Sequence, residues 1–394
     1  MKKILSINTT SFFSTGTIIK NIENALGDKY EFYHATADAE GDKSFTIIKS
    51  SAMREWKKVP SQLFGEDGFL FKKETKELIN WIDSVKPDLI HIHNLHGYYT
   101  NSEMVMNYAF KHNIPVIFTM HDCWSFTGRC ANFDCVHCDK WKVGCGNCKH
   151  KNVYPLTRLF DNSKKQWQKK KKMFVGHNIT FVTPSNYLAN LAKESFLKNE
   201  NIHTINNGID MSIFSNKITD IDLPKEIDTN KRILLSIAYP FTKEKGLEDI
   251  NRLQSMIDKD KYQIVVVGVE EDKKTVNGII RIPPTTDKRF LALLYQNAYA
   301  FLCFTYQDTY PTVLLETIAC GTPAITYDVG GCTEIIVDGI TGYSVKVGDI
   351  EEAYKKIEEI DLINKDKCQK VGLTHSIENF TKEYEKLYKN ILGE

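Results

Sequence analysis

The chain has 394 residues, with 51 lysines and arginines against 50 aspartates and glutamates, and a formal net charge of +1 at pH 7. A near-neutral chain has no overall attraction to nucleic acid or acidic lipid, so only local basic patches could bind either. A content of 42% hydrophobic and 26% charged residues excludes a disordered or fibrous chain. Because domains usually hold roughly 100–200 residues, the length predicts two domains.

The N-terminal apolar run ends at Asn8, so we interpret it as a first strand and not as a signal peptide. The longest apolar runs, such as residues 264–267, fall far short of the roughly 18 residues that cross a bilayer. We therefore expect a cytoplasmic protein. In that compartment the ten cysteines would mostly stay reduced, so a cluster of them indicates metal-binding or structural thiols before disulfides.

Short apolar or β-branched runs alternate with longer segments of helical periodicity, which is typical of parallel sheets covered by helices on both faces. The first half predicts strands at residues 4–7, 89–93, 116–120 and 180–183, and helices at residues 71–85, 103–112 and 185–193. The second half predicts strands at residues 233–238, 262–269, 300–304 and 324–327. The sequence therefore predicts an α/β protein with doubly wound sheets.

The pattern of strands restarts near residue 230, after a segment without clear periodicity. We therefore predict an N-terminal domain at residues 1–205, a linker at 206–230 and a second domain at 231–375. The C-terminal residues 376–394 contain an amphipathic helix that could close the second domain or cross back to the first. Two such domains imply a cleft between them.

The most informative segment runs from residue 305 to residue 334. Here a strand is followed by a short loop and by a helix that begins near Pro311. The free backbone amides of Thr312, Val313 and Leu314 at the start of this helix would point toward the cleft. Such helix starts bind phosphate. Asp308 and Glu316 flank this position, so one can contact sugar hydroxyls and the other ribose hydroxyls. In isolation, such an acid pair would more simply be two solvated carboxylates.

The motifs of this segment resemble those of family 4 glycosyltransferases, a retaining group that uses sugar nucleotides. The matching motifs are Asp308-x7-Glu316, Ala319-x-Gly321-x-Pro323, Gly330-Gly331-x-x-Glu334, Asp338-Gly339-x-Thr341-Gly342, Asn207-Gly208-Ile209-Asp210 with Phe214, and Lys245-Gly246. They span nearly the whole chain. The resemblance implies the GT-B fold, in which two Rossmann-like domains face each other across a cleft.

The resemblance also implies residue roles. Glu316 would hold the nucleotide ribose, Lys245 and the amides of residues 312–314 would hold the pyrophosphate, and Asp308 would face the donor sugar. His121 is assigned to the donor-sugar region, so the predicted catalytic residues are His121, Lys245 and Asp308. The predicted donor-binding residues are Thr15, Gly16, Lys243, Lys245, Asp308, Pro311, Thr312, Val313, Leu314 and Glu316.

Thr15 and Gly16 enter this set because they lie between the first strand and a helical pattern at residues 18–25, where backbone amides can approach the cleft. The chain departs from the family at Asp308 and upstream of Lys245. The family usually has glutamate at the position of Asp308, and it usually has an arginine upstream of its lysine. Lys243 can substitute for that arginine only as a point charge.

Four histidines lie in or just after the predicted strands at residues 89–93 and 116–120, near the sheet edge where open α/β sheets bind ligands. These histidines are His91, His93, His96 and His121, and a metal cluster is the alternative to the sugar-binding role. His91 and His93 have no carboxylate at an obvious ligand spacing, which disfavours the metal.

The resemblance implies front-face substitution, in which the leaving phosphate accepts the proton of the acceptor. Lys245 and the helix amides would stabilise the leaving diphosphate, so no cofactor or metal is required for catalysis. The sequence Asp220-Ile221-Asp222 lies in the predicted linker, and we interpret it as fortuitous.

Five cysteines cluster between residues 130 and 148, with Cys123 upstream. The spacing Cys135-x2-Cys138-x6-Cys145-x2-Cys148 pairs thiols as tetrahedral zinc sites do. This loop, at residues 123–150, also resembles that of a subgroup active in bacterial exopolysaccharide and O-antigen synthesis. The aligned cysteines there are Cys130, Cys138, Cys145 and Cys148, which makes Cys135 the alternative ligand. A structural zinc and a loop of reduced thiols both remain open.

The run of lysines at residues 164–172 predicts a basic helix with Trp167 and Phe174 interleaved. It could lie on the anionic inner face of the plasma membrane, close to a lipid-linked acceptor. The alternative is a solvated helix face whose lysine stems cover the sheet.

Together these features predict a retaining glycosyltransferase of cell-surface polysaccharide or lipopolysaccharide biosynthesis. It would move a hexose from a UDP- or GDP-sugar to a glycan or lipid-linked acceptor, without binding nucleic acid. A sugar-nucleotide epimerase or a phosphorylase of the same fold has no clear signature. A zinc-loop module that binds nucleic acid or protein would leave Asp308 and Glu316 unexplained.

Overall fold

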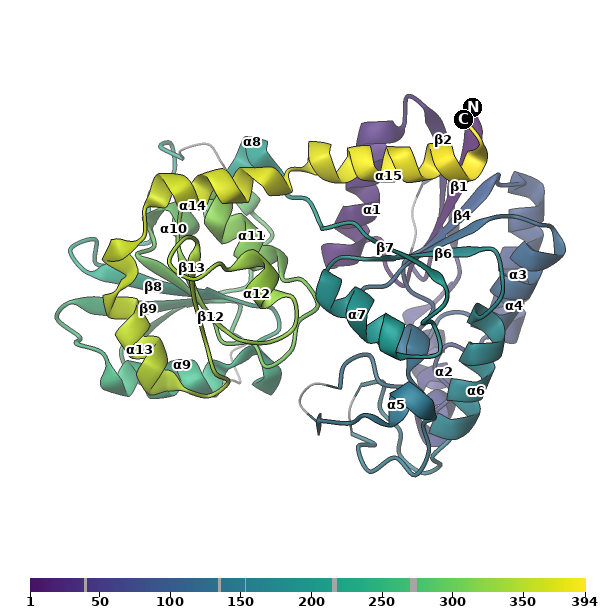
Figure 1. Ribbon diagram of the computed structural model, residues 1–394, viewed down its shortest axis with the longest axis horizontal. Helices are drawn as coiled ribbons and strands as arrows, with labels where there is room; N and C mark the ends of the chain where they lie inside the picture. The colour runs from purple at the N-terminus through teal and green to yellow at the C-terminus, as the bar shows by residue number, and fades with distance from the viewer. Residues whose placement is uncertain (39–40, 134–135, 153, 215–217, 270–274) are drawn as a thin grey trace. The chain divides into compact units, whose positions relative to one another are not determined.

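The computed structural model describes residues 1–394 except residues 39–40, 134–135, 153, 215–217 and 270–274 (Figure 1). The chain forms two compact units. The first unit contains Met1–Asn206 and Thr381–Glu394, and the second contains Asn207–Phe380. Most of the first unit therefore precedes the second along the chain, and a short C-terminal segment returns to it.

The first unit is built on a parallel sheet. In the part of the chain that the structure describes, this sheet has seven strands in the order β3-β2-β1-β4-β5-β6-β7. Strands β4, β5 and β6 are wholly buried, as expected for parallel strands covered on both faces. The strands are β1 (Lys2–Ile7), β2 (Tyr30–Thr36), β3 (Ser44–Thr46), β4 (Leu89–Ile92), β5 (Val116–Thr119), β6 (Ile179–Thr183) and β7 (Asn201–Thr204).

The helices of the first unit are α1 (Phe13–Leu26), α2 (Ser51–Phe64), α3 (Lys72–Val85), α4 (Ser102–Lys111), α5 (Lys140–Val143), α6 (Ser163–Phe174) and α7 (Asn186–Glu194), with a 3-10 turn η1 (Trp124–Phe126). Side chains cap two of them. Asn101 accepts from the Met104 amide at 3.1 Å, and Ser185 accepts from the Leu188 amide at 3.2 Å. The N-cap predicted at Ser185 is confirmed.

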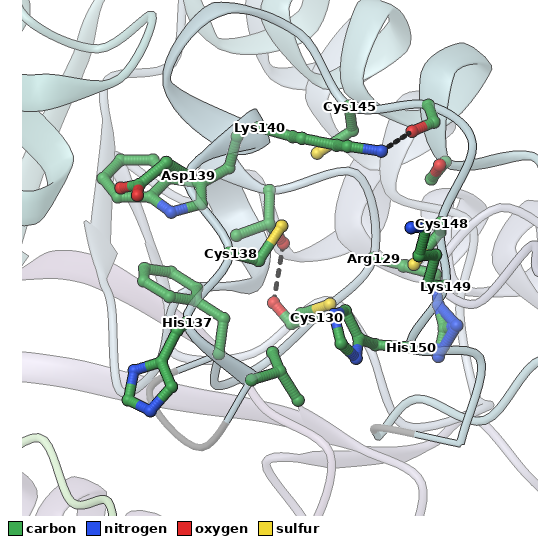
Figure 2. Close-up of a pocket in the computed structure, with 16 residues that line it drawn as sticks. Arg129, Cys130, His137, Cys138, Asp139, Lys140, Cys145, Cys148, Lys149 and His150 are labelled. Atoms are coloured by element: carbon green, nitrogen blue, oxygen red, sulfur yellow. Dashed lines mark hydrogen bonds between the residues drawn. The ribbon is translucent and has the colours of Figure 1, made fainter.

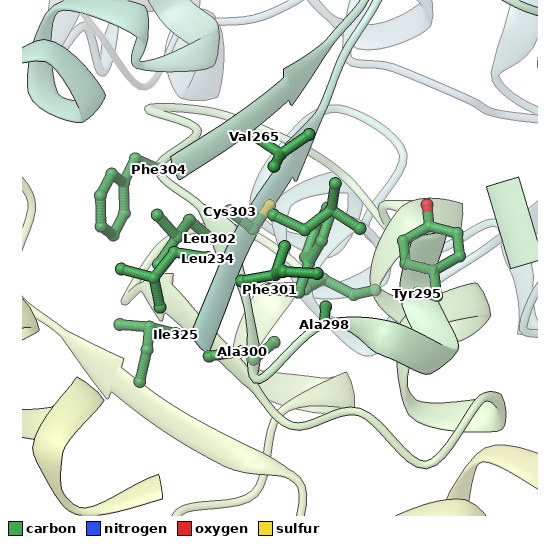
Figure 3. Packing of buried hydrophobic residues seen from close by; sticks show 14 of the residues in the cluster. Leu234, Val265, Tyr295, Ala298, Ala300, Phe301, Leu302, Cys303, Phe304 and Ile325 are labelled. Carbon is green, nitrogen blue, oxygen red and sulfur yellow. The ribbon is translucent and has the colours of Figure 1, made fainter. Parts of the chain in front are cut away.

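The second unit also contains a parallel sheet, which has six strands among the described residues, in the order β10-β9-β8-β11-β12-β13. Figure 3 shows apolar side chains of β8, β9, β11 and β12 packed in the core of this unit, among them Leu234, Val265, Phe301 and Ile325. The strands are β8 (Arg232–Ile237), β9 (Tyr262–Val267), β10 (Ile279–Ile282), β11 (Ala300–Cys303), β12 (Ala324–Tyr327) and β13 (Gly342–Val345).

Helices cover both faces of the second sheet. Helices α9 and α13 lie on one face, and α10, α11 and α14 lie on the other (Figure 1). The helices are α8 (Met211–Phe214), α9 (Leu247–Met256), α10 (Lys288–Asn297), α11 (Thr312–Ala319), α12 (Cys332–Ile335), α13 (Ile350–Glu358) and α14 (Lys365–Gly372), with 3-10 turns η3 (Lys243–Lys245), η4 (Ile360–Leu362) and η5 (Leu373–His375). The predicted α/β class with two Rossmann-like sheets is confirmed.

In both sheets the order of strands along the chain reverses beside the first strand of the unit. The reversal lies between β1 and β4 in the first unit and between β8 and β11 in the second. Open α/β sheets bind ligands at such a switch point, outside the carboxyl ends of the strands. The loops that follow these four strands are therefore where a site is expected.

The structure differs from the predictions in several elements. It adds β2, β3, β7, β10 and β13, which lie at or next to sheet edges and contain partly exposed residues, so they lack a continuous apolar run. The segment predicted as a linker at residues 206–230 belongs to the second unit from Asn207 onward. There Phe214 and Ile227 are buried in the core. Among the described residues, no helix combines the length and apolar character that crossing a bilayer requires.

The C-terminal helix α15 (Ile377–Leu392) begins in the second unit and continues into the first. Within the first unit, the Tyr388 hydroxyl lies 2.8 Å from Nδ1 of His91, and the Tyr384 hydroxyl lies 2.8 Å from Oγ1 of Thr119. Nε2 of His91 is also 2.8 Å from Oγ1 of Thr119. Burial lowers the pKa of His91 to about 3, so its ring is neutral and requires both hydroxyl partners.

We expect Tyr388→Phe to destabilise the protein, because one nitrogen of the buried His91 ring would lose its partner. Such a loss costs about 1–3 kcal/mol, which lowers the melting temperature by several degrees. Thermal unfolding followed by circular dichroism measures the change. Tyr239→Phe is the matched control, since Tyr239 is exposed. Equal melting temperatures for wild type and Tyr388→Phe would contradict this account of α15.

Candidate functional site

Lys245 and Asp308 form an ion pair at the switch point of the second sheet. Lys245 ends the turn η3, which follows β8, and Asp308 lies in the loop after β11. Nζ of Lys245 is 2.9 Å from Oδ2 of Asp308. The Asp308 carboxylate raises the pKa of Lys245 despite its partial burial. The structure thus brings together two of the three predicted catalytic residues.

Glycines allow the backbone of these loops to approach closely. A Cβ on Gly246 would lie 2.2 Å from the Phe304 carbonyl oxygen, and Gly246 has a φ of +77°. A Cβ on Gly330 would lie 1.8 Å from the Asp308 carbonyl oxygen, which also accepts from the Gly331 amide at 3.1 Å. Any side chain at these glycines would therefore displace the loop that carries Asp308.

Helix α11 begins beside this loop, with Pro311 as its N-cap. Thr312 and Val313 are partly exposed, as an anion-binding helix start requires. The Leu314 amide instead donates to the Pro311 carbonyl at 3.1 Å, and the Leu314 side chain is fully buried. The prediction that Leu314 offers a free amide is therefore wrong, because the first turn uses it.

Glu316 lies further along α11 and is partly buried. The Tyr295 hydroxyl, from α10, donates to Oε2 of Glu316 at 3.0 Å. Burial raises the pKa of Glu316 to about 7, although the Tyr295 hydrogen bond opposes the rise. Tyr295 is in turn held by Thr322, whose Oγ1 donates to its carbonyl at 2.6 Å. Tyr295 is not among the predicted site residues, since nothing in its local pattern separates it from a core aromatic.

The remaining predicted donor-binding residues are Lys243, which lies in η3 with Lys245, and Thr15 and Gly16, which lie in the first unit. Lys243 is exposed at the start of η3. Thr15 and Gly16 lie in the first turn of α1, which begins at Phe13 and not at the predicted residue 18. The Gly16 amide donates to the Phe12 carbonyl at 3.3 Å, so it is not free to bind a ligand as predicted. Nδ2 of Asn8 donates to Oγ1 of Thr15 at 3.0 Å.

In the first unit, His121 follows β5 at the carboxyl edge of the sheet. Its Nε2 lies 3.1 Å from Nδ1 of His93, and the two rings stack with centroids 5.4 Å apart. Burial lowers the pKa of His121 to about 4 and that of His93 well below its usual value. Both rings are therefore neutral near pH 7, so one donates a hydrogen bond to the other.

A second pair lies beside these histidines. Nε2 of His96 is 2.8 Å from Oδ2 of Asp122, whose Oδ1 accepts from the Trp124 amide at 2.8 Å. Burial opposes the charged form of His96, but the Asp122 carboxylate raises the pKa of His96 overall. In the described part of the chain, no three His, Cys, Asp or Glu side chains are grouped to hold a metal, and these histidines make pairwise contacts.

The cysteine loop surrounds a cavity of about 310 Å³ (Figure 2). Cys130, Cys138, Cys145 and Cys148 line it together with His137 and His150. Burial raises the pKa of Cys130 to about 11 and that of Cys145 to about 12. The Gly128 amide donates to Sγ of Cys145 at 3.1 Å. Cys135, the alternative zinc ligand, lies outside the described residues.

The basic helix α6 presents its aromatic residues to the core. Trp167 and Phe174 are buried, so the predicted interleaving of aromatics on a membrane-facing surface is wrong for this helix. Lys170 is also buried, and its Nζ donates to the carbonyls of Trp124 and Thr127 at 2.6 and 3.2 Å. Burial lowers the pKa of Lys170 to about 7. Only the opposite face of α6 carries exposed lysines.

Two families match consecutive parts of the chain. Residues 34–213 match the family described as Glycosyltransferase Family 4, and residues 218–372 match the family described as Glycosyl transferases group 1. The Lys245–Asp308 pair, α11 and Glu316 all lie within the second match.

Curated relatives agree with these matches. WcaC of Escherichia coli K12, whose name assigns it to colanic acid biosynthesis as a glycosyl transferase, is 26% identical over 283 residues, 70% of this chain and 66% of WcaC. N-acetyl-α-D-glucosaminyl L-malate synthase of Bacillus anthracis is 26% identical over 225 residues, 53% of this chain and 58% of that protein. The chain thus spans less than two thirds of the length of these relatives.

Solved structures share the fold. Sucrose-phosphate synthase of Thermosynechococcus elongatus superposes with a TM-score of 0.72 at 13% identity, over 100% of both chains. HepE of Anabaena, in complex with UDP-glucose, gives a TM-score of 0.67 at 11% identity, over 99% of this chain and 100% of HepE. The predicted GT-B fold class is confirmed by this likeness. Residues 34–213 and 218–372 thus match two glycosyltransferase families, and the group 1 match lies in the second unit.

Proposed function

We propose that this protein is a retaining glycosyltransferase that moves a hexose from a nucleoside diphosphate donor to a glycan or lipid-linked glycan. The observation that carries the proposal is the ion pair of Lys245 and Asp308 beside the start of α11. A cation and a carboxylate at the switch point, followed by the start of α11 and by Glu316 within that helix, suit a diphosphate flanked by two sugars.

The two carboxylates differ in their surroundings, which supports different roles. Asp308 contacts Lys245, so it holds the lysine in place and leaves hydrogen-bond capacity for hydroxyls of the donor sugar. Glu316 contacts Tyr295 on α10 and would accept hydrogen bonds from the ribose hydroxyls. We propose that Lys245 and the amides of Thr312 and Val313 bind the diphosphate.

The proposed reaction needs no enzyme nucleophile. The oxygen of the acceptor hydroxyl forms a bond to the anomeric carbon on the face that the phosphate oxygen leaves. As the bond between anomeric carbon and phosphate oxygen breaks, that phosphate oxygen takes the proton of the acceptor hydroxyl. Lys245 stabilises the negative charge that develops on the leaving group. His121, from the first unit, is proposed as the third catalytic residue, acting as a neutral hydrogen-bonding group.

The acceptor class is proposed from the relatives. WcaC is named for colanic acid biosynthesis, and CapM of Staphylococcus aureus, 22% identical over 182 residues, is named for capsular polysaccharide biosynthesis. Both names support an acceptor that belongs to a cell-surface polysaccharide. The UDP-glucose complex of HepE supports testing uridine donors before guanosine donors.

We expect Glu316→Ala to weaken binding of the free nucleoside diphosphate by at least about tenfold, because a ribose contact is lost. Asp308→Ala should keep that binding and lose affinity for the intact sugar donor. A thermal-shift panel of UDP, GDP, ADP and their sugar conjugates measures both effects, since ligand at 100 times its Kd stabilises by about 2.7 kcal/mol.

Glu351→Ala, an exposed acid on α13 in the same unit, is the control for this panel and should resemble wild type. Identical behaviour of the Glu316 and Asp308 variants would contradict the division of roles. Folded wild-type protein that shifts with no nucleotide would count against the proposed function itself.

Donor affinity should rise with pH in the neutral range. The carboxylate form of Glu316 accepts the ribose hydroxyls, and with a pKa of about 7 this form is lost as pH falls. Between about pH 6 and pH 8, affinity for an intact sugar donor should therefore increase by about tenfold. Titration calorimetry measures the affinity at each pH. The ligand is a sugar conjugate, because its diphosphate does not change protonation state in this pH range. Glu316→Gln should flatten the profile, and an unchanged slope in this variant would refute the assignment.

We also propose a structural Zn²⁺ in the cysteine loop. Its support is that Cys130, Cys138, Cys145 and Cys148 line one cavity, and thiolates are preferred zinc ligands. The described residues contain no preformed group of three metal-binding side chains, so the cation would have to draw the thiols together. It would also stabilise the thiolates against the burial that raises their pKa.

Metal analysis of protein purified without chelators should give about one zinc per chain. The double variant Cys138→Ser/Cys148→Ser should lose the zinc and melt at a lower temperature, because the loop loses its cross-link. Cys320→Ser, in the second unit, is the control and should keep the metal. Wild-type protein that neither contains nor takes up zinc would exclude the site.

A further inference from the structure

Helix α2 and the loop before α6 form an exposed apolar surface on the first unit. The residues are Trp56 (80% exposed), Val59, Phe64, Leu159 (60% exposed) and Phe160 (54% exposed), which together we call the α2 surface. Single exposed apolar residues are common, but a group of large ones marks an interaction site. Trp56 and Val59 lie three residues apart and so share one side of the helix.

The opposite side of α2 is polar and packs on the first unit. Nη2 of Arg54 donates to the Gly97 carbonyl at 2.8 Å, and Nζ of Lys57 forms an ion pair with Glu74. Ser61 and Gln62 are buried. The helix is therefore oriented with its polar side toward its own domain and its apolar side toward solvent. This is the reverse of the usual orientation of a surface helix, whose apolar side covers the core.

Hydrogen bonds join the loop to the end of α2, so the two segments form one surface. The Arg158 amide donates to the Gln62 carbonyl at 2.8 Å, and the Phe160 amide donates to the Leu63 carbonyl at 3.1 Å. The rings of Phe64 and Phe160 stack with centroids 5.5 Å apart and planes 7° from parallel. The apolar side chains of helix and loop are thus held together.

Basic residues surround the α2 surface. Arg158 precedes Leu159, whose carbonyl accepts from Nζ of Lys151 at 3.1 Å. Lys58 instead lies over the ring of the buried Tyr98, on the domain side of α2. The loop leads directly into α6, whose first turn carries Lys164 and Lys165 exposed. Glu66, which pairs with Lys165, and Asp161, which follows Phe160, offset part of this charge. The margin of the surface remains net positive.

We infer that the α2 surface docks the protein on an anionic lipid bilayer. Trp and Phe side chains insert at the headgroup level, and the surrounding lysines and arginine are attracted to acidic headgroups. This combination of apolar centre and basic margin matches a membrane better than it matches a second copy of the chain, whose margin would carry the same charge. The exposed lysines of α6 contribute to the margin, whereas its buried aromatics do not take part.

The biological reason for docking rests on the proposed function, since it would bring the enzyme to a lipid-linked acceptor. Docking itself does not depend on that function. Nucleotide binding and membrane binding can therefore fail separately: a protein that binds vesicles but no nucleotide keeps this inference and loses the proposed function.

Flotation of the full-length protein with vesicles tests the inference. Wild type should float with vesicles of phosphatidylcholine and phosphatidylglycerol, not with phosphatidylcholine alone, and salt should weaken binding. Trp56→Ala/Phe160→Ala should reduce partitioning by about tenfold or more, because the inserted rings are lost. Arg158→Glu/Lys164→Glu should also reduce partitioning onto anionic vesicles, because it removes the attraction between these basic side chains and the acidic headgroups. Leu362→Ala, an equally exposed residue of the second unit (78%), should bind like wild type.

Circular dichroism establishes that each variant is folded before flotation. The inference is overturned if folded wild type does not float with anionic vesicles, or if the aromatic double variant floats as well as wild type. It is also overturned if sedimentation shows a wild-type dimer that this variant abolishes, since the α2 surface would then bind a second copy.

Discussion

In a parallel sheet all strands end at the same edge, and the loops that follow them meet wherever the strand order reverses. This constraint creates the candidate site in the second unit. It brings the turn after β8 next to the loop after β11, although the two segments are more than sixty residues apart in the sequence, so that Lys245 reaches Asp308. Gly246, Gly330 and Gly331 allow the approach, since a Cβ at any of them would overlap a backbone atom of these loops.

The same geometry gives two nearby carboxylates different electrostatic properties. Asp308 contacts a lysine, whereas burial raises the pKa of Glu316 to about 7 and the hydrogen bond from the Tyr295 hydroxyl opposes that rise. A cation lies beside one acid and an aromatic hydroxyl lies beside the other, and this difference supports the separate roles proposed for them. In the first unit, burial lowers the pKa of His93 and of His121, so both rings are neutral hydrogen-bonding groups.

The first unit shows how a sequence can predict a helix correctly and its surroundings wrongly. The basic run at residues 164–172 does form a helix, but Trp167 and Phe174 pack inward and Lys170 is buried against Trp124. Exposed aromatic residues are found instead on α2, which carries Trp56 and Phe64, and at Phe160 in the loop before α6. Helix α2 was not predicted, and it contains Pro60, a residue that normally argues against a helix interior.

The sequence alone determined the α/β class, the two sheets, most central strands and the motif that contains Asp308 and Glu316, because apolar runs and helical periodicity are local properties of the chain. Edge strands escaped prediction, since partial exposure removes the apolar run. The tertiary structure decided that the Leu314 and Gly16 amides are already used, that Tyr295 contacts Glu316, and which side of α2 and α6 faces solvent. Burial and hydrogen bonding of this kind depend on residues far apart in the chain, so no local pattern contains them.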